Sequence, residues 1–411
     1  MIPTSAPNTQ NAVGGTAAHD AKRLSVGVSG LYLGLYIHYG FFAFLPLWLK
    51  ATGAGPEEIG ILMAIPLILR LLTVAPFSAW VGRLGRVRDA IAFTALGSAV
   101  VILTLLGQPE HAGRIAIVVL FSIIWDQLPV LTDAYAVMAV RSRGLDFGRL
   151  RVFGSIAVVI SNAAAGWAIG VAGIKALPIM IAALLLIPAA IVLGLPRDRK
   201  LVAQEEAKGG RWRDVLRDRK LLRAMMAASL VVGSHGVLTS FGAIQWTERG
   251  ISTGAIGLLQ ALAVSAEILA FWFGAKLLGK RDPSLLICLA GLAAILRWAL
   301  MAADPGMAVL IFSQILNGIS ATGAILGIML VIAARVSGDL SAAAQGVNAV
   351  LFGAVLAVST AGSGMLWSYG LAPAYLAMAA LAALGAVFAL PSRDRATAHR
   401  ANRLSATGTD L

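Results

Sequence analysis

The chain has 411 residues, of which 58% are hydrophobic and only 13% are charged, and its mean hydropathy is +0.83. A soluble domain is roughly one quarter charged, so this composition excludes a soluble globular protein and indicates a polytopic membrane protein. The net charge of +13 does not indicate a nucleic-acid partner, because 27 of the 33 lysines and arginines fall in the termini and loops on one side of the expected membrane.

This skew follows the positive-inside rule and predicts that both termini are cytoplasmic. We therefore expect a multi-pass protein of a bacterial inner membrane, surrounded by lipid. Residues 1–26 are polar and small and are expected to form a disordered cytoplasmic tail. The first apolar run after them is too long for a signal-peptide core and predicts a retained helix.

Twelve apolar runs are long enough to span a membrane, which takes about 20 residues. Short connections between most of them predict antiparallel neighbours. The expected spans are 27–48, 58–80, 89–107, 114–140, 150–172, 174–195, 222–246, 254–278, 284–303, 306–334, 342–368 and 370–390.

One long internal segment, 196–221, carries charges of both signs and is predicted to link two six-helix bundles, 27–195 and 222–390. Residues 391–411 are expected to form a second cytoplasmic tail. The fold class is therefore predicted to be all-α, with twelve transmembrane helices in two six-helix pseudo-repeats.

The end of the linker, RWRDVLRDRK, predicts a short amphipathic helix at the cytoplasmic face. Such a helix would turn Trp212, Val215 and Leu216 toward lipid. A solvated linker helix is the simpler alternative.

The second half of the chain repeats the first at an offset of 197 residues, the difference between His38 and His235. Internal repeats of long hydrophobic helices are typical of secondary transporters, whose substrate site lies between the repeats near mid-membrane. The further matched pairs are Gly53 with Gly250, Ile59-Gly60 with Ile256-Gly257, Leu62 with Leu259 and Ala64 with Ala261.

Five residues that would be ionised in water lie within the expected spans: Arg70, Asp126, Asp133, Glu267 and Arg297. Each costs roughly 2.5–3.5 kcal/mol at the bilayer centre, so they are expected to face a cavity or one another. Pairing both arginines leaves one carboxylate over, and in an apolar interior its least costly state is protonated. We therefore predict proton coupling, with helix-locking ion pairs as the structural alternative.

Asp126 and Asp133 are seven residues apart, which predicts that they share one helix face. Pro129 between them is expected to loosen the helix and to free a backbone carbonyl toward the cavity.

Arg70 is the predicted site for a substrate carboxylate. His38 and His235 are candidates for donating to a substrate oxygen, and Tyr36 for stacking on an aromatic substrate. Gln314 and Asn317 are further candidates for contacting a ligand. For each of these side chains, packing or helix-to-helix hydrogen bonding is the structural alternative.

Enzyme chemistry is not predicted. The single cysteine, Cys288, lies in an apolar run, and the five histidines show no metal spacing, so we expect neither metal nor cofactor. The segment from Gly274 to Lys280 matches the start of a phosphate-binding loop, but Arg281 replaces its Ser or Thr and no strand precedes it.

Four segments carry a resemblance to a known family: LPVLTDAY (128–135) with DFGRLRVFGS (146–155), AVSAEILAFWF (263–273), ILRWALM (295–301), and the text from LWLK to GAGPEEIGIL at 47–62. In them the chain resembles the phenylpropionate-permease branch of the major facilitator superfamily, near lactose permease and the nucleoside–proton symporters.

This resemblance implies proton-driven uptake of a small organic solute. By position, Glu267 and Arg297 resemble the helix 8 acid and helix 9 arginine that serve substrate binding and proton coupling in lactose-permease-type symporters. Asp133 matches the family's helix 4 aspartate, and Arg149 and Arg151 match the basic residues of its cytoplasmic gating loop.

The chain also departs from the lactose permease pattern. Gln314 and Asn317 stand where that protein carries a His and acid pair in helix 10, and helix 5 lacks a mid-span arginine. Galactoside transport is therefore not expected, and the proton carrier is sought among Glu267, Asp133 and Asp126.

The sequence thus predicts a monomeric, proton-coupled importer of a small solute, such as an aromatic or other organic acid. An efflux antiporter and a nucleoside or sugar symporter of the same fold are the alternatives. A membrane-embedded enzyme would need clustered nucleophiles, bases or metal ligands, which the sequence does not show.

Overall fold

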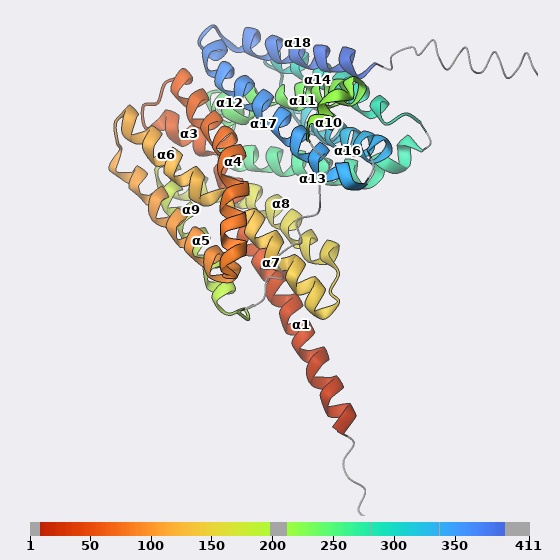
Figure 1. The fold of residues 1–411 in the computed structure, drawn as a ribbon. Helices are drawn as coiled ribbons and strands as arrows, with labels where there is room; N and C mark the ends of the chain where they lie inside the picture. Colours follow the sequence, from red (N-terminus) through yellow and green to blue (C-terminus); the bar gives the residue numbers. More distant parts are fainter. Residues whose placement is uncertain (1–8, 198–211, 280, 337, 391–411) are drawn as a thin grey trace, which may run out of the picture.

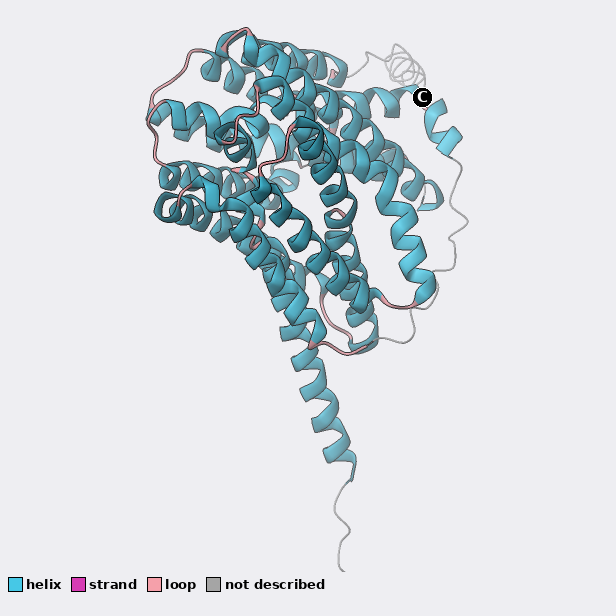
Figure 2. Cartoon of the chain, turned by 90° about the vertical axis from the view of Figure 1, so that its left-hand side faces the viewer, coloured by secondary structure: helices cyan, strands magenta, loops and turns pink. Residues whose placement is uncertain are grey.

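Residues 9–197, 212–279, 281–336 and 338–390 are described in a computed structural model, and every regular element among them is a helix (Figures 1 and 2). Eleven helices are long and apolar enough to cross a membrane, or twelve if the bent pair Ala21–Phe42 and Leu45–Ala51 counts as one span. This confirms the predicted all-α polytopic architecture.

The N-terminal half comprises six consecutive spans. Its elements are α1 (Thr9–Tyr36), α2 (Tyr39–Phe42), α3 (Leu45–Ala51), α4 (Pro56–Leu84), α5 (Val87–Leu103), η1 (Thr104–Gly107), α6 (His111–Trp125), α7 (Gln127–Arg143), α8 (Phe147–Ala172), η2 (Ile174–Ala176) and α9 (Leu177–Leu193).

The C-terminal half repeats this order after a short connecting helix. Its elements are α10 (Trp212–Arg217), α11 (Arg219–Gly233), α12 (Gly236–Glu248), α13 (Thr253–Leu278), α14 (Ser284–Ala302), α15 (Met307–Asn317), η3 (Gly318–Thr322), α16 (Gly323–Arg335), α17 (Gly338–Ser368) and α18 (Leu371–Ala389).

Two expectations about the ends of the bundles need correction. Helix α1 begins at Thr9, inside the segment predicted as a disordered tail, and its first turns extend beyond the bundle (Figure 1). The predicted linker helix exists as α10, but of its three side chains predicted to face lipid only Trp212 and Leu216 are exposed. Val215 is buried, because α10 packs against α17 and α11 instead of lying free in lipid. Residues 1–8, 198–211 and 391–411 lie outside the described part of the chain.

Four spans are interrupted near their middle. The first breaks between α1 and α2 and again between α2 and α3; the fourth breaks at Asp126, between α6 and α7. Two of these breaks follow from proline, which has no N–H to donate to the carbonyl four residues before it. Pro46 leaves the carbonyl of Phe42 without this helical hydrogen bond, and Pro129 leaves the carbonyl of Trp125 without it.

The C-terminal half breaks at the matching places without a proline. The seventh span breaks at Ser234 and His235, between α11 and α12, and the tenth contains the π-helical turn η3. Glycines flank both irregularities. Discontinuous helices at mid-membrane are typical of transporter substrate sites, and π-turns are frequent at functional sites.

Two serines on neighbouring helices satisfy backbone groups that the breaks set free. Ser161 of α8 accepts a hydrogen bond of 2.9 Å from Gly40 N and donates to Ile37 O. Ser359 of α17 donates to Gly233 O at 2.5 Å. The sequence analysis missed this pair, although Ser161 and Ser359 match at an offset of 198 residues.

Ser161→Ala is expected to destabilise the protein, because it leaves the buried Gly40 N and the part-buried Ile37 O without this partner. The expected loss is about 1–3 kcal/mol, measured as a lower midpoint in thermal unfolding of the purified protein. Ser122→Ala is the matched control, since Ser122 is also buried but bonds only the Val118 carbonyl of its own helix, at 2.6 Å. Equal losses in the two variants would contradict a special role for Ser161.

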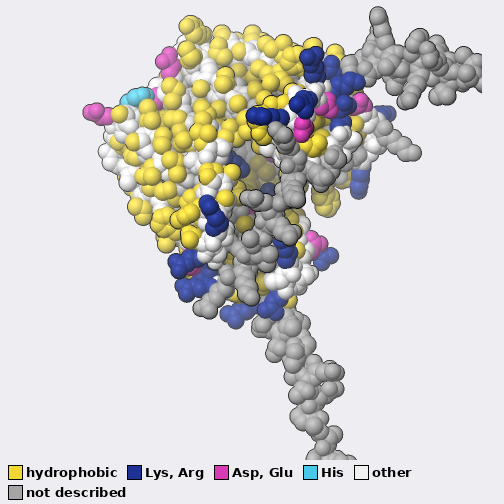
Figure 3. Space-filling model, in the orientation of Figure 1, with side chains coloured by type: hydrophobic (Ala, Val, Ile, Leu, Met, Phe, Trp, Pro, Cys, Tyr) yellow, Lys and Arg dark blue, Asp and Glu magenta, His cyan; other side chains and the backbone are white. Residues whose placement is uncertain are grey.

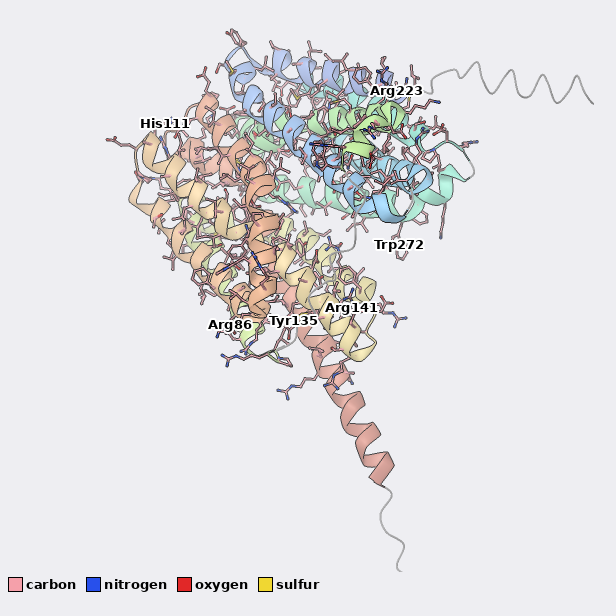
Figure 4. All side chains as sticks on the ribbon, viewed as in Figure 1. Arg86, His111, Tyr135, Arg141, Arg223 and Trp272 are labelled. Atoms are coloured by element: carbon pink, nitrogen blue, oxygen red, sulfur yellow. The ribbon has the colours of Figure 1, made fainter. Side chains whose placement is uncertain are left out.

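The molecule has two unlike ends. One, which we call the basic face, holds the helix ends near Arg86, Arg143, Leu193 and Arg219; Figure 4 labels Arg86 and Arg141 there. The opposite face holds the helix ends near Lys50 and Glu248. Hydrophobic side chains cover the flanks between them, and Lys and Arg gather at the basic face (Figure 3).

The two halves meet closely at the opposite face. Lys50 of α3 and Glu248 of α12 form an ion pair there. Two glycine pairs lie between the halves. A Cβ built on Gly60 of α4 would be 2.9 Å from Gly364 Cα of α17, and one on Gly257 of α13 would be 3.0 Å from Gly166 Cα of α8. These contacts close the opposite face, while the surface is hollowed between the halves toward the basic face (Figure 3).

Candidate substrate and proton sites

Glu267 and Arg297 are joined by an amide instead of an ion pair. Asn317, the last residue of α15, donates from Nδ2 to Glu267 Oε1 at 2.6 Å and accepts from Arg297 Nη1 at Oδ1, at 2.5 Å. One amide side chain therefore connects the carboxylate of Glu267 to the guanidinium of Arg297. The three residues come from α13, α14 and α15.

Arg297 is held in a polar cage and is only 1% exposed. Its Nε donates to Ser313 Oγ and its Nη2 donates to Gln314 Oε1, each at 3.3 Å, and its guanidinium lies 4.6 Å from the ring centroid of Trp298. Such neutral partners satisfy the donors of a buried guanidinium without neutralising its charge. Gln314 and Asn317, predicted as ligand contacts, are thus buried partners of Arg297.

The turn η3 follows Asn317 directly and packs against α13. A Cβ on Gly318 would lie 2.4 Å from Ala266 O, so only glycine allows this approach. Thr322 Oγ1 donates to Glu267 O at 3.4 Å. The π-turn therefore fixes Asn317 beside Glu267.

In the N-terminal half, Asp133 lies close to the basic face in a partly exposed cluster. Arg151 Nη1 donates to both its carboxylate oxygens, at 2.8 and 3.0 Å, and Tyr32 OH donates to Oδ1 at 2.7 Å. Arg149 and Arg151 were expected in a gating loop, but both lie in the first turns of α8. Arg149 points to solvent, 88% exposed, and Arg151 ties α8 to α7.

Asp126 stands apart from Asp133. It lies at the break between α6 and α7, is 3% exposed, and its Oδ2 has no hydrogen-bond partner among the described residues. The sequence predicted a shared helix face, but the break gives the two carboxylates different surroundings. An ionised carboxylate is costly to bury without partners.

Arg70 is an exposed side chain at the middle of α4, and the described residues offer it no hydrogen bond or ion pair. Helix α4, which carries Arg70, packs against α6 and α7, the two parts of the fourth span. A guanidinium in that position is available to a ligand.

An aromatic wall runs along the breaks of the first and fourth spans. Tyr36 and Tyr39 have ring centroids 4.8 Å apart, Tyr39 and Trp125 5.3 Å, and Phe42 and Trp125 4.9 Å. Tyr36, Tyr39 and Trp125 are partly exposed. The prediction for Tyr36 thus widens to a group of aromatic side chains, of which the sequence analysis named only Tyr36.

The two repeat-related histidines are packing residues in this structure. His38 is fully buried and accepts a 2.8 Å hydrogen bond from Trp125 Nε1, so it does not line the cavity as expected. His235 bonds Ser320 Oγ at 3.1 Å and the carbonyls of Val231 and Val232. Each histidine flanks a helix break and contacts a tryptophan, Trp125 or Trp298.

The expected pairing of both arginines with carboxylates is therefore not found among the described residues. Arg297 binds amides and a hydroxyl, and Arg70 has no ion-pair partner. The same part of the chain contains no group of three or more His, Cys, Asp or Glu that could hold a metal ion.

Comparisons with known proteins agree with this architecture. Residues 27–377 match the family model described as "MFS_1 like family". The chain is 28% identical over 367 residues to an Escherichia coli (strain K12) protein named "Probable 3-phenylpropionic acid transporter", covering 88% of this chain and 95% of that protein. It is 24% identical over 210 residues to maltose permease of Geobacillus stearothermophilus, covering 50% and 52%.

Solved structures share the fold. A mutant of the nucleoside transporter NupG has a TM-score of 0.77 at 17% identity and covers 89% of this chain and 98% of its own. A bacterial homologue of the human lysosomal transporter Spinster, inward-facing and unoccupied, has a TM-score of 0.73 at 13% identity, covering 90% and 96%. The chain is thus a membrane transporter and not an enzyme, and it belongs to the MFS_1-like family of the major facilitator superfamily.

Proposed function

We propose that the protein couples the inward movement of protons to the uptake of a small organic acid, with an aromatic acid as the favoured substrate. The relative named as a probable 3-phenylpropionic acid transporter supports this substrate class. Transport proceeds by alternating access between the two halves.

One observation carries the proposal. Arg70 is a mid-membrane guanidinium with no hydrogen-bond or ion-pair partner among the described residues, and its helix α4 packs against α6, which ends at Trp125 of the aromatic wall. A guanidinium binds a carboxylate bidentately, and aromatic rings stack on an aromatic group. Together they offer complementary contacts to the two ends of an aromatic acid.

The orientation proposed here places the basic face, and with it both termini, in the cytoplasm, following the positive-inside rule. The ion pair of Lys50 with Glu248 then closes the external side, and the hollow between the halves opens inward. The Asp133–Arg151 pair lies near the inner mouth of this hollow, where we propose that it takes part in gating.

Glu267 is the proposed proton carrier. It is partly exposed, so it can exchange protons with water, and Asn317 connects it to the buried Arg297. Asp126 is the alternative, because its carboxylate has an oxygen without a partner, but it is buried from water in this conformation. The third candidate carboxylate, Asp133, is already held by two hydrogen bonds from Arg151.

The test is uptake of radiolabelled 3-phenylpropionate by proteoliposomes with an imposed inward proton gradient. Accumulation that exceeds passive entry into protein-free liposomes and collapses with a protonophore is the expected result. A nucleoside and maltose, added as competitors, should leave uptake unchanged. Accumulation under an outward proton gradient would instead indicate an efflux antiporter.

Arg70→Lys is expected to weaken binding of the acid by about tenfold or more, because a lysine holds a carboxylate only as a point charge. Binding of 3-phenylpropanol, which has the same ring but no carboxylate, should change little. Both affinities can be measured by calorimetry on purified protein. Equal losses for the acid and the alcohol would show that Arg70 has a structural role.

A further inference from the structure

A second polar cavity lies outside the path between the halves. It has a volume of about 320 Å³ and opens at the basic face, where α11 and α14 begin and α16 and α18 end. The residues that matter for its chemistry are Lys220, Arg223, Asp282, Ser284, Arg335 and Phe388. Figure 4 labels Arg223 at this end of the C-terminal half.

Its two arginines each use only part of their hydrogen-bonding capacity on the described residues. Arg223 Nη2 donates to Leu390 O at 2.5 Å, and Arg335 Nε lies 3.5 Å from Asp218 Oδ2. A guanidinium has five N–H donors, so several donors on each arginine remain for a ligand in the cavity.

The two nearby acids are occupied by helix capping. Asp282 Oδ1 accepts from Ser284 N at 2.9 Å and from Ser284 Oγ at 2.6 Å. Asp218 Oδ1 accepts from Lys220 N and Leu221 N, each at 3.0 Å. Since two helices begin and two end at this cavity, their dipoles largely offset one another. Among the described residues, the three cations Lys220, Arg223 and Arg335 outnumber the two carboxylates of Asp218 and Asp282, so the cavity favours an anion.

The surroundings of the cavity indicate what kind of anion it takes. Phe388, in its wall, is 41% exposed, and the neighbouring Leu285 and Leu390 are 37% and 51% exposed. Apolar side chains that face lipid thus lie directly beside the cationic groups. This arrangement matches a phospholipid, whose acyl chains lie along the helices while its phosphate sits at the membrane surface.

We propose that this cavity binds the phosphate of an anionic phospholipid of the inner leaflet, with Arg223 and Arg335 as the main contacts. The proposal uses the orientation of the basic face given above but does not depend on the transported substrate.

The experiment measures thermal stabilisation of the detergent-purified full chain by phosphatidylglycerol, by phosphatidylcholine with the same acyl chains, and by inorganic phosphate. Of the three ligands, phosphatidylglycerol should need the lowest concentration to stabilise the protein against thermal unfolding. Arg335→Gln and Lys220→Gln should each raise that concentration about tenfold. Arg141→Gln, which removes an exposed arginine of the basic face far from the cavity, should leave it unchanged.

Three results would overturn the proposal. Equal stabilisation by the two lipids would mean that the headgroup charge is not recognised. Equal losses in Arg335→Gln and Arg141→Gln would indicate diffuse attraction to the whole basic face. Stabilisation by inorganic phosphate but not by phosphatidylglycerol would assign the cavity to a soluble anion. Because the experiment measures thermal stability and not transport, its failure would not count against the proposed uptake function.

Discussion

Cross-linking cysteines placed at Lys50 and Glu248 is expected to abolish transport. These residues form the ion pair that joins α3 of one half to α12 of the other at the opposite face. Alternating access requires that face to open in each cycle, so a covalent bond there holds the protein in one conformation. Uptake by proteoliposomes is measured before oxidation, after it, and after reduction, with Cys288 replaced by serine to remove the native thiol.

A cross-link within one half is the matched control. Glu58 and Arg114, whose side chains meet at 2.7 Å at the same face, both belong to the N-terminal half. Cysteines there should react and leave turnover intact. Gly257→Val should lower the yield of the cross-link between the halves, because it pushes the halves apart. A Cβ at that position would lie 2.4 Å from Asn162 O. Full cross-linking of the Lys50 and Glu248 positions with unchanged uptake would exclude this model of alternating access.

Sequence alone was sufficient for the architecture, because hydropathy depends only on composition along the chain. It was not sufficient for the helix breaks. Pro46 and Pro129 signal two of them, but the breaks beside His235 and at Gly318 have no proline. They depend on close approach between helices, as at Gly318 against Ala266, which a single sequence does not encode locally.

The mid-membrane charges were also visible in the sequence, but their partners were not. Counting signs suggested ion pairs, whereas Arg297 uses Ser313, Gln314 and Asn317. Which polar atom meets a guanidinium depends on how three helices pack, and the oxygen of an uncharged amide can accept its hydrogen bonds as well as a carboxylate oxygen can be its partner. Extending the repeat search to an offset of 198 residues would have paired Ser161 with Ser359 and Gly166 with Gly364.

Glu267→Gln is expected to eliminate uphill accumulation while preserving substrate binding. Glutamine has the shape of a protonated glutamate, and its side-chain oxygen can still accept the hydrogen bond from Asn317 Nδ2 while Asn317 Oδ1 accepts from Arg297. The variant therefore keeps the link to Arg297 but cannot release a proton. Binding should also lose its difference between mildly acidic and mildly basic buffer, because the group that exchanges the proton is gone.

The measurement compares accumulation driven by a proton gradient of one pH unit with exchange of labelled for unlabelled substrate. One proton per substrate supports about tenfold accumulation, and the variant should reach no more than the passive entry seen in protein-free liposomes. Exchange needs no net proton movement, so it should continue near the native rate. Asp126→Asn is the comparison, since Asp126 is the alternative proton carrier, and it should retain accumulation. If Glu267→Gln still accumulates substrate while Asp126→Asn does not, the proton is carried at the break of the fourth span, and the amide link to Arg297 has a structural role.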